Sequence, residues 1–276
     1  KVYADRNDVI WFGSVGGGLG RFDGGKFTHY TAADGLADNK VRTLLEDRDR
    51  NLWIGTWKGL SRLRDGKLPS YTSQDGLPND FVEALFEDRE GSLWIGTRGG
   101  GLARLRDGTF SVLTAKEGLP SDSPRCVLES SDGSLWIGTD GGGLTRSRGG
   151  KSTRFTTEHG LLSNSVLSLA EDQAGAIWAG TEHPPGLHKF DGGRFTPITE
   201  SQGFYTETAI RVIFPDREGT LWIGTDGGGL RQLRNGAFHA FTTRDGLPSD
   251  LIRAISQDRE GNLWIGTSEG LCRVRD

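Results

Sequence analysis

Four arginines recur at one position of a repeated sequence unit, and their chemistry suits the binding of anions. Each lies eleven residues before a tryptophan, where two further units have Glu83 and Leu167. The four are Arg42, Arg125, Arg211 and Arg253. A guanidinium group presents a planar fork of N–H donors that matches carboxylate, sulfate or phosphate oxygens. If these positions face one axis, we expect them to form a positively charged ring that binds an anionic ligand.

The alternative is that each arginine pairs with a polar side chain nearby. In five units a polar residue lies three positions before the arginine position, and three of these residues are acidic. They are Asn39, Asp80, Asp122, Asn164 and Asp250. Local ion pairs of this kind would neutralise the ring.

A second variable position lies four residues after the repeated tryptophan, in a loop. An exposed tryptophan there, Trp57, offers a flat surface for a sugar ring or a partner, or else it packs on a neighbouring part of the fold. The segment 201–207 departs from its counterparts and brings in Tyr205, another aromatic residue. Positions that break a repeat rule are candidates for function. The loop residues expected to contact a ligand are Trp57, Lys58, Arg98, Asp140, His183, Tyr205 and Asp226.

Signals for catalysis are weak. Glu182 beside His183 is the one plausible acid–base pair in these loops, and it defines a minor alternative, a metal-dependent lyase. The sequence contains no G-x-S-x-G, H-E-x-x-H or Cys–His pattern. We therefore expect a protein without enzymatic activity, cofactor or metal.

The elements that position these residues come from an internal repeat. The pentapeptide Leu-Trp-Ile-Gly-Thr, or a close variant, occurs seven times, with its tryptophans 41 to 44 residues apart. This period is typical of a four-stranded β-propeller blade. Each unit contains four short strand patterns separated by Gly- and Asp-rich turns. We expect the tryptophans to be wedged between neighbouring sheets.

The expected fold is all-β, a seven-bladed β-propeller of blades of about 42 residues, with the outer strand of the last blade missing. One propeller domain spans 1–276. The expected blades cover about 1–31, 41–72, 82–114, 124–157, 166–199, 209–242 and 251–276. In this arrangement the first strand of each blade lines a central channel, and the variable loops gather at its mouth.

Composition excludes several classes of protein. The chain of 276 residues has 33 basic and 37 acidic residues without a basic block, which disfavours nucleic-acid binding. Its apolar runs are too short to span a membrane. Two cysteines are too few for a disulfide framework.

The combination of Leu-Trp-Ile-Gly-Thr, Gly-Gly-Leu and Asp-Gly-Leu-Pro-Ser-Asp resembles the two-component regulator propeller repeat over essentially the whole chain. That resemblance implies an extracytoplasmic sensor region of a bacterial hybrid histidine kinase that detects oligosaccharides. It also implies a periplasmic or extracellular location, and signalling domains of the same polypeptide as partners.

The resemblance and the residues together predict a ligand-binding sensor module. We expect an acidic or sulfated oligosaccharide, or a similar small molecule, to bind at the channel mouth. An interaction scaffold that binds a protein on one face is the main alternative. Neither nucleic acid nor membrane is expected to contact this segment.

Overall fold

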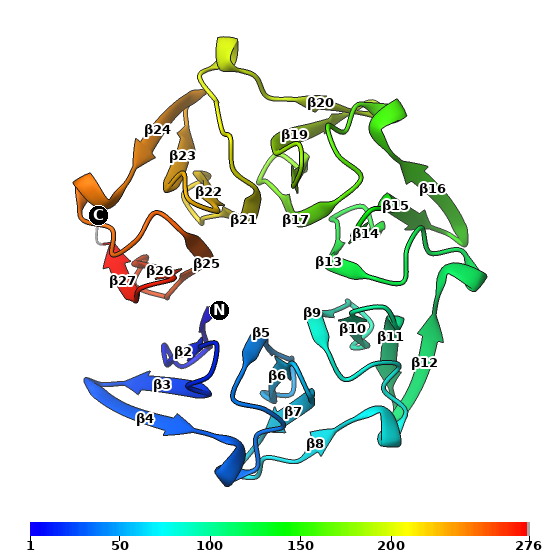
Figure 1. Ribbon diagram of the computed structural model, residues 1–276, viewed down its shortest axis with the longest axis vertical. Helices are drawn as coiled ribbons and strands as arrows, with labels where there is room; N and C mark the ends of the chain where they lie inside the picture. Colours follow the sequence, from blue (N-terminus) through cyan, green and yellow to red (C-terminus); the bar gives the residue numbers. More distant parts are fainter. Residues whose placement is uncertain (275–276) are drawn as a thin grey trace. The chain divides into compact units, whose positions relative to one another are not determined.

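The computed structural model describes residues 1–274 and consists of short antiparallel sheets joined by loops. Six sheets have four strands in sequence order and the seventh has three, so the fold is a seven-bladed β-propeller with an incomplete last blade (Figure 1). This confirms the fold predicted from the repeat. The chain divides into two compact units, Lys1–Val127 and Leu128–Asp276.

The strands fall into four equivalent sets. First strands are β1 (Val2–Ala4), β5 (Val41–Glu46), β9 (Val82–Glu87), β13 (Pro124–Glu129), β17 (Val166–Glu171), β21 (Ile210–Pro215) and β25 (Ile252–Gln257). Second strands are β2 (Ile10–Gly13), β6 (Leu52–Thr56), β10 (Leu93–Thr97), β14 (Leu135–Thr139), β18 (Ile177–Thr181), β22 (Leu221–Thr225) and β26 (Leu263–Thr267). Third strands are β3 (Leu19–Asp23), β7 (Gly59–Leu63), β11 (Gly101–Arg106), β15 (Gly143–Arg148), β19 (Gly186–Asp191), β23 (Leu230–Arg234) and β27 (Leu271–Val274). Fourth strands are β4 (Lys26–Tyr30), β8 (Ser70–Tyr71), β12 (Thr109–Leu113), β16 (Lys151–Phe155), β20 (Arg194–Pro197) and β24 (Ala237–Phe241).

Each loop between blades contains a short 3-10 helix that the sequence reasoning missed. The six helices are η1 (Ala32–Asp34), η2 (Ser73–Asp75), η3 (Ala115–Glu117), η4 (Thr157–His159), η5 (Glu200–Gln202) and η6 (Thr243–Asp245). In η1 the Thr31 hydroxyl accepts the Ala33 N–H, while Asp34 accepts the N–H of Thr31. Gly35 then ends the turn with a φ of 103°, which favours glycine. The interblade loops are therefore ordered turns.

The fourth strand of the second blade is shorter than its counterparts. β8 covers only Ser70–Tyr71, whereas the other fourth strands have four or five residues. Pro69 has no N–H to donate to the ladder, although its carbonyl still accepts the Arg62 N–H at 2.9 Å.

The repeated tryptophans pack between neighbouring blades, as expected. Trp53 of the second blade lies in one core cluster with Val82, Leu93 and Ile95 of the third. In the other unit, Trp222 of the sixth blade packs in the same way against Ile252 and Ile265 of the seventh.

The indole N–H of each tryptophan also has a fixed partner six residues earlier. Trp222 Nε1 donates to Asp216 Oδ2 at 2.8 Å, and Asp216 Oδ1 accepts the N–H of Thr220 in the hairpin turn. In the fourth blade Ser130 takes this role for Trp136, at 3.0 Å. One aspartate side chain, such as that of Asp216, thus accepts hydrogen bonds from both a backbone N–H of the turn and the buried indole N–H.

Within each unit, first strands of successive blades are neighbours. Figure 1 shows β5 beside β9, and β21 beside β17 and β25. In five blades the pairing of first and second strands shifts register by one residue next to the arginine position. Such a β-bulge leaves one residue out of the ladder and re-aims its side chain. The residues at the bulge are Arg42, Glu83, Leu167, Arg211 and Arg253.

Candidate functional site

In the first unit, three arginines converge on one buried carboxylate. Arg42 Nε donates to Glu83 Oε2 at 2.8 Å, Arg98 Nε donates to Oε1 at 2.8 Å, and Arg125 Nη1 donates to Oε1 at 3.1 Å. The Glu83 side chain is 1% exposed, whereas those of Arg42 and Arg98 are 40% and 51% exposed. We call these four residues the Glu83 cluster.

The Glu83 carboxylate stays ionised in this environment. Burial by itself would raise its pKa, but the charges of Arg42 and Arg125 and the hydrogen bonds from Arg42 and Arg98 hold the pKa of Glu83 below its ordinary value. The cluster therefore carries three guanidinium groups against one carboxylate.

An aromatic stack adjoins the Glu83 cluster. The Arg98 guanidinium carbon lies 3.9 Å from the centre of the Phe81 ring, and Phe81 stacks on Trp57 with ring centres 5.0 Å apart. Lys40 Nζ lies over the Trp57 ring at 4.3 Å. Trp57 thus packs on the segment that leads into the next blade, and 39% of it stays exposed. Cation–π contacts of this kind fix the guanidinium plane as well as the ring.

In the second unit, the corresponding positions form a balanced network. Arg211 Nε donates to Asp226 Oδ2 at 3.0 Å, and Arg211 Nη2 also reaches Glu182 Oε1 at 3.2 Å. Arg253 Nη1 lies 3.0 Å from Asp226 Oδ1. We call these four residues the Asp226 cluster. Its two guanidinium groups face two carboxylates, which leaves no excess positive charge among them.

The arginines pair with acids other than those considered from the sequence. Asn39, Asp80, Asp122, Asn164 and Asp250 instead accept hydrogen bonds from backbone N–H groups at the start of the η turns. The four arginines therefore fall into two sets, one around Glu83 and one around Asp226.

The remaining loop candidates have different surroundings. Asp140 Oδ1 accepts a hydrogen bond from Ser165 Oγ at 2.8 Å. Lys58 is exposed. The Tyr205 residue is 57% exposed, and its hydroxyl donates to Glu207, a contact that raises the pKa of Tyr205.

Glu182 and His183 do not form a close acid–base pair. His183 Nε2 lies 3.7 Å from Glu182 Oε1, beyond hydrogen-bond distance, and the His183 side chain is largely exposed. Glu182 instead binds Arg211. Among residues 1–274, no three metal-ligating side chains gather into one group.

Phe81 and Lys40 are the site residues that the sequence reasoning missed. Glu83 was seen at the arginine position but was not selected. The signal available was a charge reversal: the third blade has Glu83 and Arg98 where the sixth has Arg211 and Asp226.

The repeated sequence matches a known family. The family model described as the two component regulator propeller matches residues 35–58, 76–99, 118–141, 160–183, 205–227 and 246–269. These matches cover more than half of the sequence, and the chain belongs to that family. None of the functionally curated proteins matches the sequence significantly.

Solved structures of similar fold include two kinds of protein, extracellular domains of two component systems and a lyase. The extracellular domain of a protein named as a hybrid two component system of B. thetaiotaomicron is 24% identical with a TM-score of 0.86, over 99% of this chain and 38% of that one. A second such domain, also from B. thetaiotaomicron, is 24% identical with a TM-score of 0.82, over 100% and 38%. A catalytically inactive virginiamycin B lyase from Staphylococcus aureus is 16% identical with a TM-score of 0.80, over 99% and 92%. At these identities the likeness shows the fold alone, and the chain spans well under half the length of the first two structures.

The helices of residues 1–274 are single 3-10 turns, and none has the length and apolar character needed to cross a bilayer.

Proposed function

We propose that this chain is the ligand-binding sensor module of a two-component signalling protein and that it recognises an anionic small molecule. The proposed ligand class is an acidic or sulfated oligosaccharide. The Glu83 cluster carries this proposal, because it holds more guanidinium groups than carboxylates.

The exposure of the cluster supports a binding role. Glu83 lies beneath the arginines and fixes their forks, while Arg42 and Arg98 keep a large part of their side chains in contact with solvent. Donors that are already held in place lose little entropy when a ligand binds. A carboxylate or sulfate group would accept hydrogen bonds from the exposed guanidinium groups of Arg42 and Arg98.

The neighbouring aromatic stack supports an oligosaccharide over a bare inorganic anion. Trp57 retains an exposed part beside the guanidinium groups, and Lys58 follows it in the same loop. The apolar face of a sugar ring can pack on an indole while its anionic substituent meets the arginines. Tyr205, His183 and Asp140 of the second unit stay predicted ligand-binding residues.

Family membership supports the sensor role, a location outside the cytoplasm, and signalling domains of the same polypeptide as partners. The similar fold of two extracellular domains of two component systems also supports the sensor role and this location. We infer no enzymatic activity.

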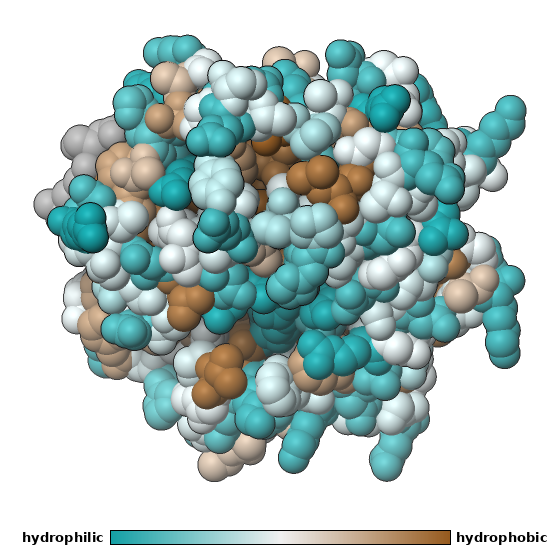
Figure 2. All heavy atoms as spheres, turned by 45° about the horizontal axis from the view of Figure 1, so that its top comes forward, coloured by the Kyte–Doolittle hydropathy of each residue, from teal (hydrophilic) through white to brown (hydrophobic). Residues whose placement is uncertain are grey.

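A protein-binding scaffold receives less support from the surface. Figure 2 shows apolar side chains in small separate patches among hydrophilic ones on the face in view. A large contiguous apolar patch, which marks many protein-binding sites, is not seen on this face.

The proposal is tested by calorimetric titration of a sulfated oligosaccharide and its desulfated counterpart. Arg42→Ala and Arg253→Ala form a matched pair, because both residues sit at the bulge and both side chains are about 40% exposed. We expect Arg42→Ala to weaken binding of the sulfated ligand by about tenfold or more, and Arg253→Ala to change it little. Equal binding of sulfated and desulfated forms would refute the anion preference.

A further inference from the structure

Two histidines hold the loop between the fourth and fifth blades. This loop, residues 156–165, joins β16 to β17 and contains η4 (Figure 1). The Thr156 N–H donates to His159 Nδ1 at 3.3 Å, and the Leu162 N–H donates to Nε2 of His188 in β19 at 2.9 Å. Each histidine therefore accepts a hydrogen bond from the backbone of the same loop.

These hydrogen bonds require neutral rings. An imidazole nitrogen accepts only while it carries no proton, and in the neutral ring the other nitrogen carries it. The proton of His188 is therefore on Nδ1, which lies 3.3 Å from the Ala179 carbonyl oxygen, and that of His159 is on Nε2. A second proton on either ring would face a backbone N–H, which is a donor only, so the hydrogen bond to the loop would be lost.

The other interblade loops have no histidine at the position of His159. In η1, for example, Asp34 accepts the N–H of Thr31. The five residues at this position are Asp34, Asp75, Glu117, Gln202 and Asp245. A carboxylate or amide oxygen remains an acceptor at a pH at which an ordinary histidine is already charged.

The position of His188 is also occupied differently elsewhere. Ser61 has the same place in the third strand of the second blade, and its Oγ accepts the Ala37 N–H at 2.9 Å. Three other loops offer no N–H here, because a proline follows the buried leucine. These prolines are Pro78, Pro120 and Pro248. The loop of residues 156–165 therefore differs from its counterparts at both of its anchors.

Burial keeps His188 neutral. His188 is fully buried, which lowers its pKa from 6.5 to about 4, while hydrogen bonds with the backbone of Ala179 and Gly186 act in the opposite sense. No charged side chain of residues 1–274 contributes to this shift of the pKa. An opening of the loop that lets water reach the ring is therefore favoured as the pH falls below 6.5.

His159 lies in a more open environment. It is half-buried, and its ring is edge-on to that of Phe155. Charged groups of both signs flank its turn. They are Glu158 of η4, Arg154 of β16 and Arg194 of β20. Because the ring is partly exposed, a proton can reach it from solvent without a prior opening of the loop.

The end of the same loop holds two residues of the neighbouring loops. The Ser165 carbonyl accepts the Glu182 N–H at 3.0 Å, and Ser165 Oγ donates to Asp140 Oδ1 at 2.8 Å. Glu182 in turn binds Arg211 of the Asp226 cluster. The backbone of the loop thus connects the two histidines to that cluster.

We propose that this loop is a pH-sensitive switch, in which protonation of His159 and His188 releases residues 156–165 and loosens Glu182. The switch acts on the Asp226 cluster of the second unit. It does not depend on the proposed ligand or on the Glu83 cluster.

The test is amide hydrogen exchange of the intact protein, followed by NMR at pH 7 and pH 5 and corrected for the intrinsic exchange rate. We expect the opening equilibrium at Leu162 to rise about twentyfold, as follows from the two pKa values of His188. The Thr156 and Glu182 amides should rise with it by several-fold. The Ala37 amide, which Ser61 holds, should change by less than about twofold.

The double variant His159→Asp with His188→Ser gives the loop the anchors of the second blade. It should remove the rise at Leu162 and at Thr156, and His159→Asp alone should reduce the rise at Thr156. Circular dichroism shows whether the double variant is folded. If it is not, His188→Asn replaces His188→Ser, because an amide oxygen accepts without titrating.

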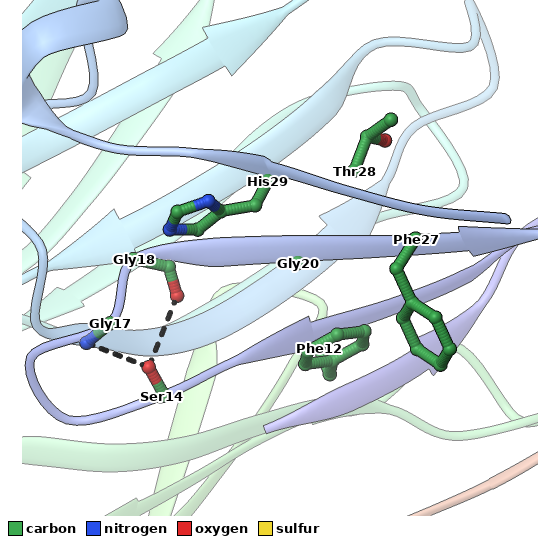
Figure 3. Close-up of a pocket in the computed structure, with 8 residues that line it drawn as sticks. All are labelled: Phe12, Ser14, Gly17, Gly18, Gly20, Phe27, Thr28 and His29. Carbon is green, nitrogen blue, oxygen red and sulfur yellow. Dashed lines mark hydrogen bonds between the residues drawn. The ribbon is translucent and has the colours of Figure 1, made fainter.

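His29→Ser is the matched control, because His29 is an exposed histidine of β4 outside these loops. The Ser14 turn drawn with it in Figure 3 is held by hydrogen bonds of Ser14 with Gly17 and Gly18. This variant should keep the full rise at Leu162. An equal rise at Leu162 and Ala37, a full rise in the folded double variant, or an unchanged Thr156 or Glu182 amide overturns the proposal.

Discussion

Glu83 and Arg98 form an ion pair, with Arg98 Nε 2.8 Å from Glu83 Oε1, at two positions where the sixth blade has the same pair with its charges exchanged. In the sixth blade the arginine comes from the first strand and the acid, Asp226, from the loop. The exchange matters because neighbouring blades add further arginines to the acidic residue of each pair. Glu83 also binds Arg42 and Arg125, and Asp226 also binds Arg253. Three arginines thus meet the one carboxylate of Glu83, whereas two arginines meet the two carboxylates of Glu182 and Asp226.

Glu83→Gln should destabilise the protein in a way that an anion reverses. The variant removes the carboxylate that Arg42, Arg98 and Arg125 share, and we expect the free energy of unfolding to fall by about 2 kcal/mol. Sulfate should then bind in place of the carboxylate and raise the melting temperature more than it does for the unmodified protein. Thermal melts in sodium sulfate and in sodium chloride of equal ionic strength measure this.

Asp226→Asn is the matched control for this experiment. It leaves Arg211 paired with Glu182, so sulfate should restore less stability. A sulfate response of equal size in both variants would contradict the distinction between the clusters.

The buried indole N–H of Trp222 should require a hydrogen-bond acceptor, but either aspartate or serine should be able to supply it. Asp216→Ala leaves the Trp222 indole N–H and the turn N–H of Thr220 unsatisfied, and we expect a loss of about 2 to 3 kcal/mol in denaturant unfolding. The double variant Asp216→Ser with Glu218→Asp reproduces the turn of the fourth blade, where Ser130 accepts the indole. It should recover most of the loss. If the double variant is as unstable as Asp216→Ala, the serine turn of the fourth blade cannot replace the aspartate turn of the sixth.

Stability should depend on pH through His188, which is fully buried in the fifth blade. Burial lowers the pKa of His188 from 6.5 to about 4, and its Nε2 accepts the Leu162 N–H, which requires the neutral ring. Between pH 6.5 and 4 the unfolded chain binds a proton at this residue that the folded chain does not. The stability contributed by neutral His188 is therefore complete above pH 6.5 and is lost as the pH falls toward 4.

The comparison with His188→Ser isolates this effect, because Ser61 fills the same position in the second blade. From pH 7 to pH 4 the unmodified protein should lose about 3 kcal/mol more than the variant in chemical unfolding. Parallel pH profiles would show that His188 does not titrate in this way.

The fold could be predicted from the sequence because one signal repeats. Seven tryptophans at a constant period fix the number of sheets, and the apolar residues on both sides of Leu-Trp-Ile-Gly-Thr show that each sheet is covered on both faces. The η turns were missed because Thr-x-x-Asp-Gly is too short to show helical periodicity. Their role became clear only from the Thr31 and Asp34 hydrogen bonds.

The site could be predicted only as a set of positions. The arginines were identified from their spacing, but some of the acids that they meet lie in a neighbouring blade. Glu83 is 41 residues from Arg42 and 42 from Arg125, so no local pattern links them. The bulge that re-aims these residues also leaves no mark in the sequence.

Trp57 should support ligand binding through its contact with Phe81, the ring on which Arg98 lies. Trp57→Ala removes the ring on which Phe81 stacks and so loosens Arg98, and we expect several-fold weaker binding of the sulfated oligosaccharide. Trp57→Phe should keep most of the affinity in the same calorimetric titration. If the two variants bind equally well, the stack does not support the cluster.

The most direct measurement is NMR of the arginine Nε–Hε groups during titration with a sulfated oligosaccharide. Anion binding at the Glu83 cluster predicts saturable shifts of Arg42, Arg98 and Arg125, with Arg211 and Arg253 little changed. Shifts confined to Arg211 and Arg253, or no saturable shift in any of the five, would contradict it.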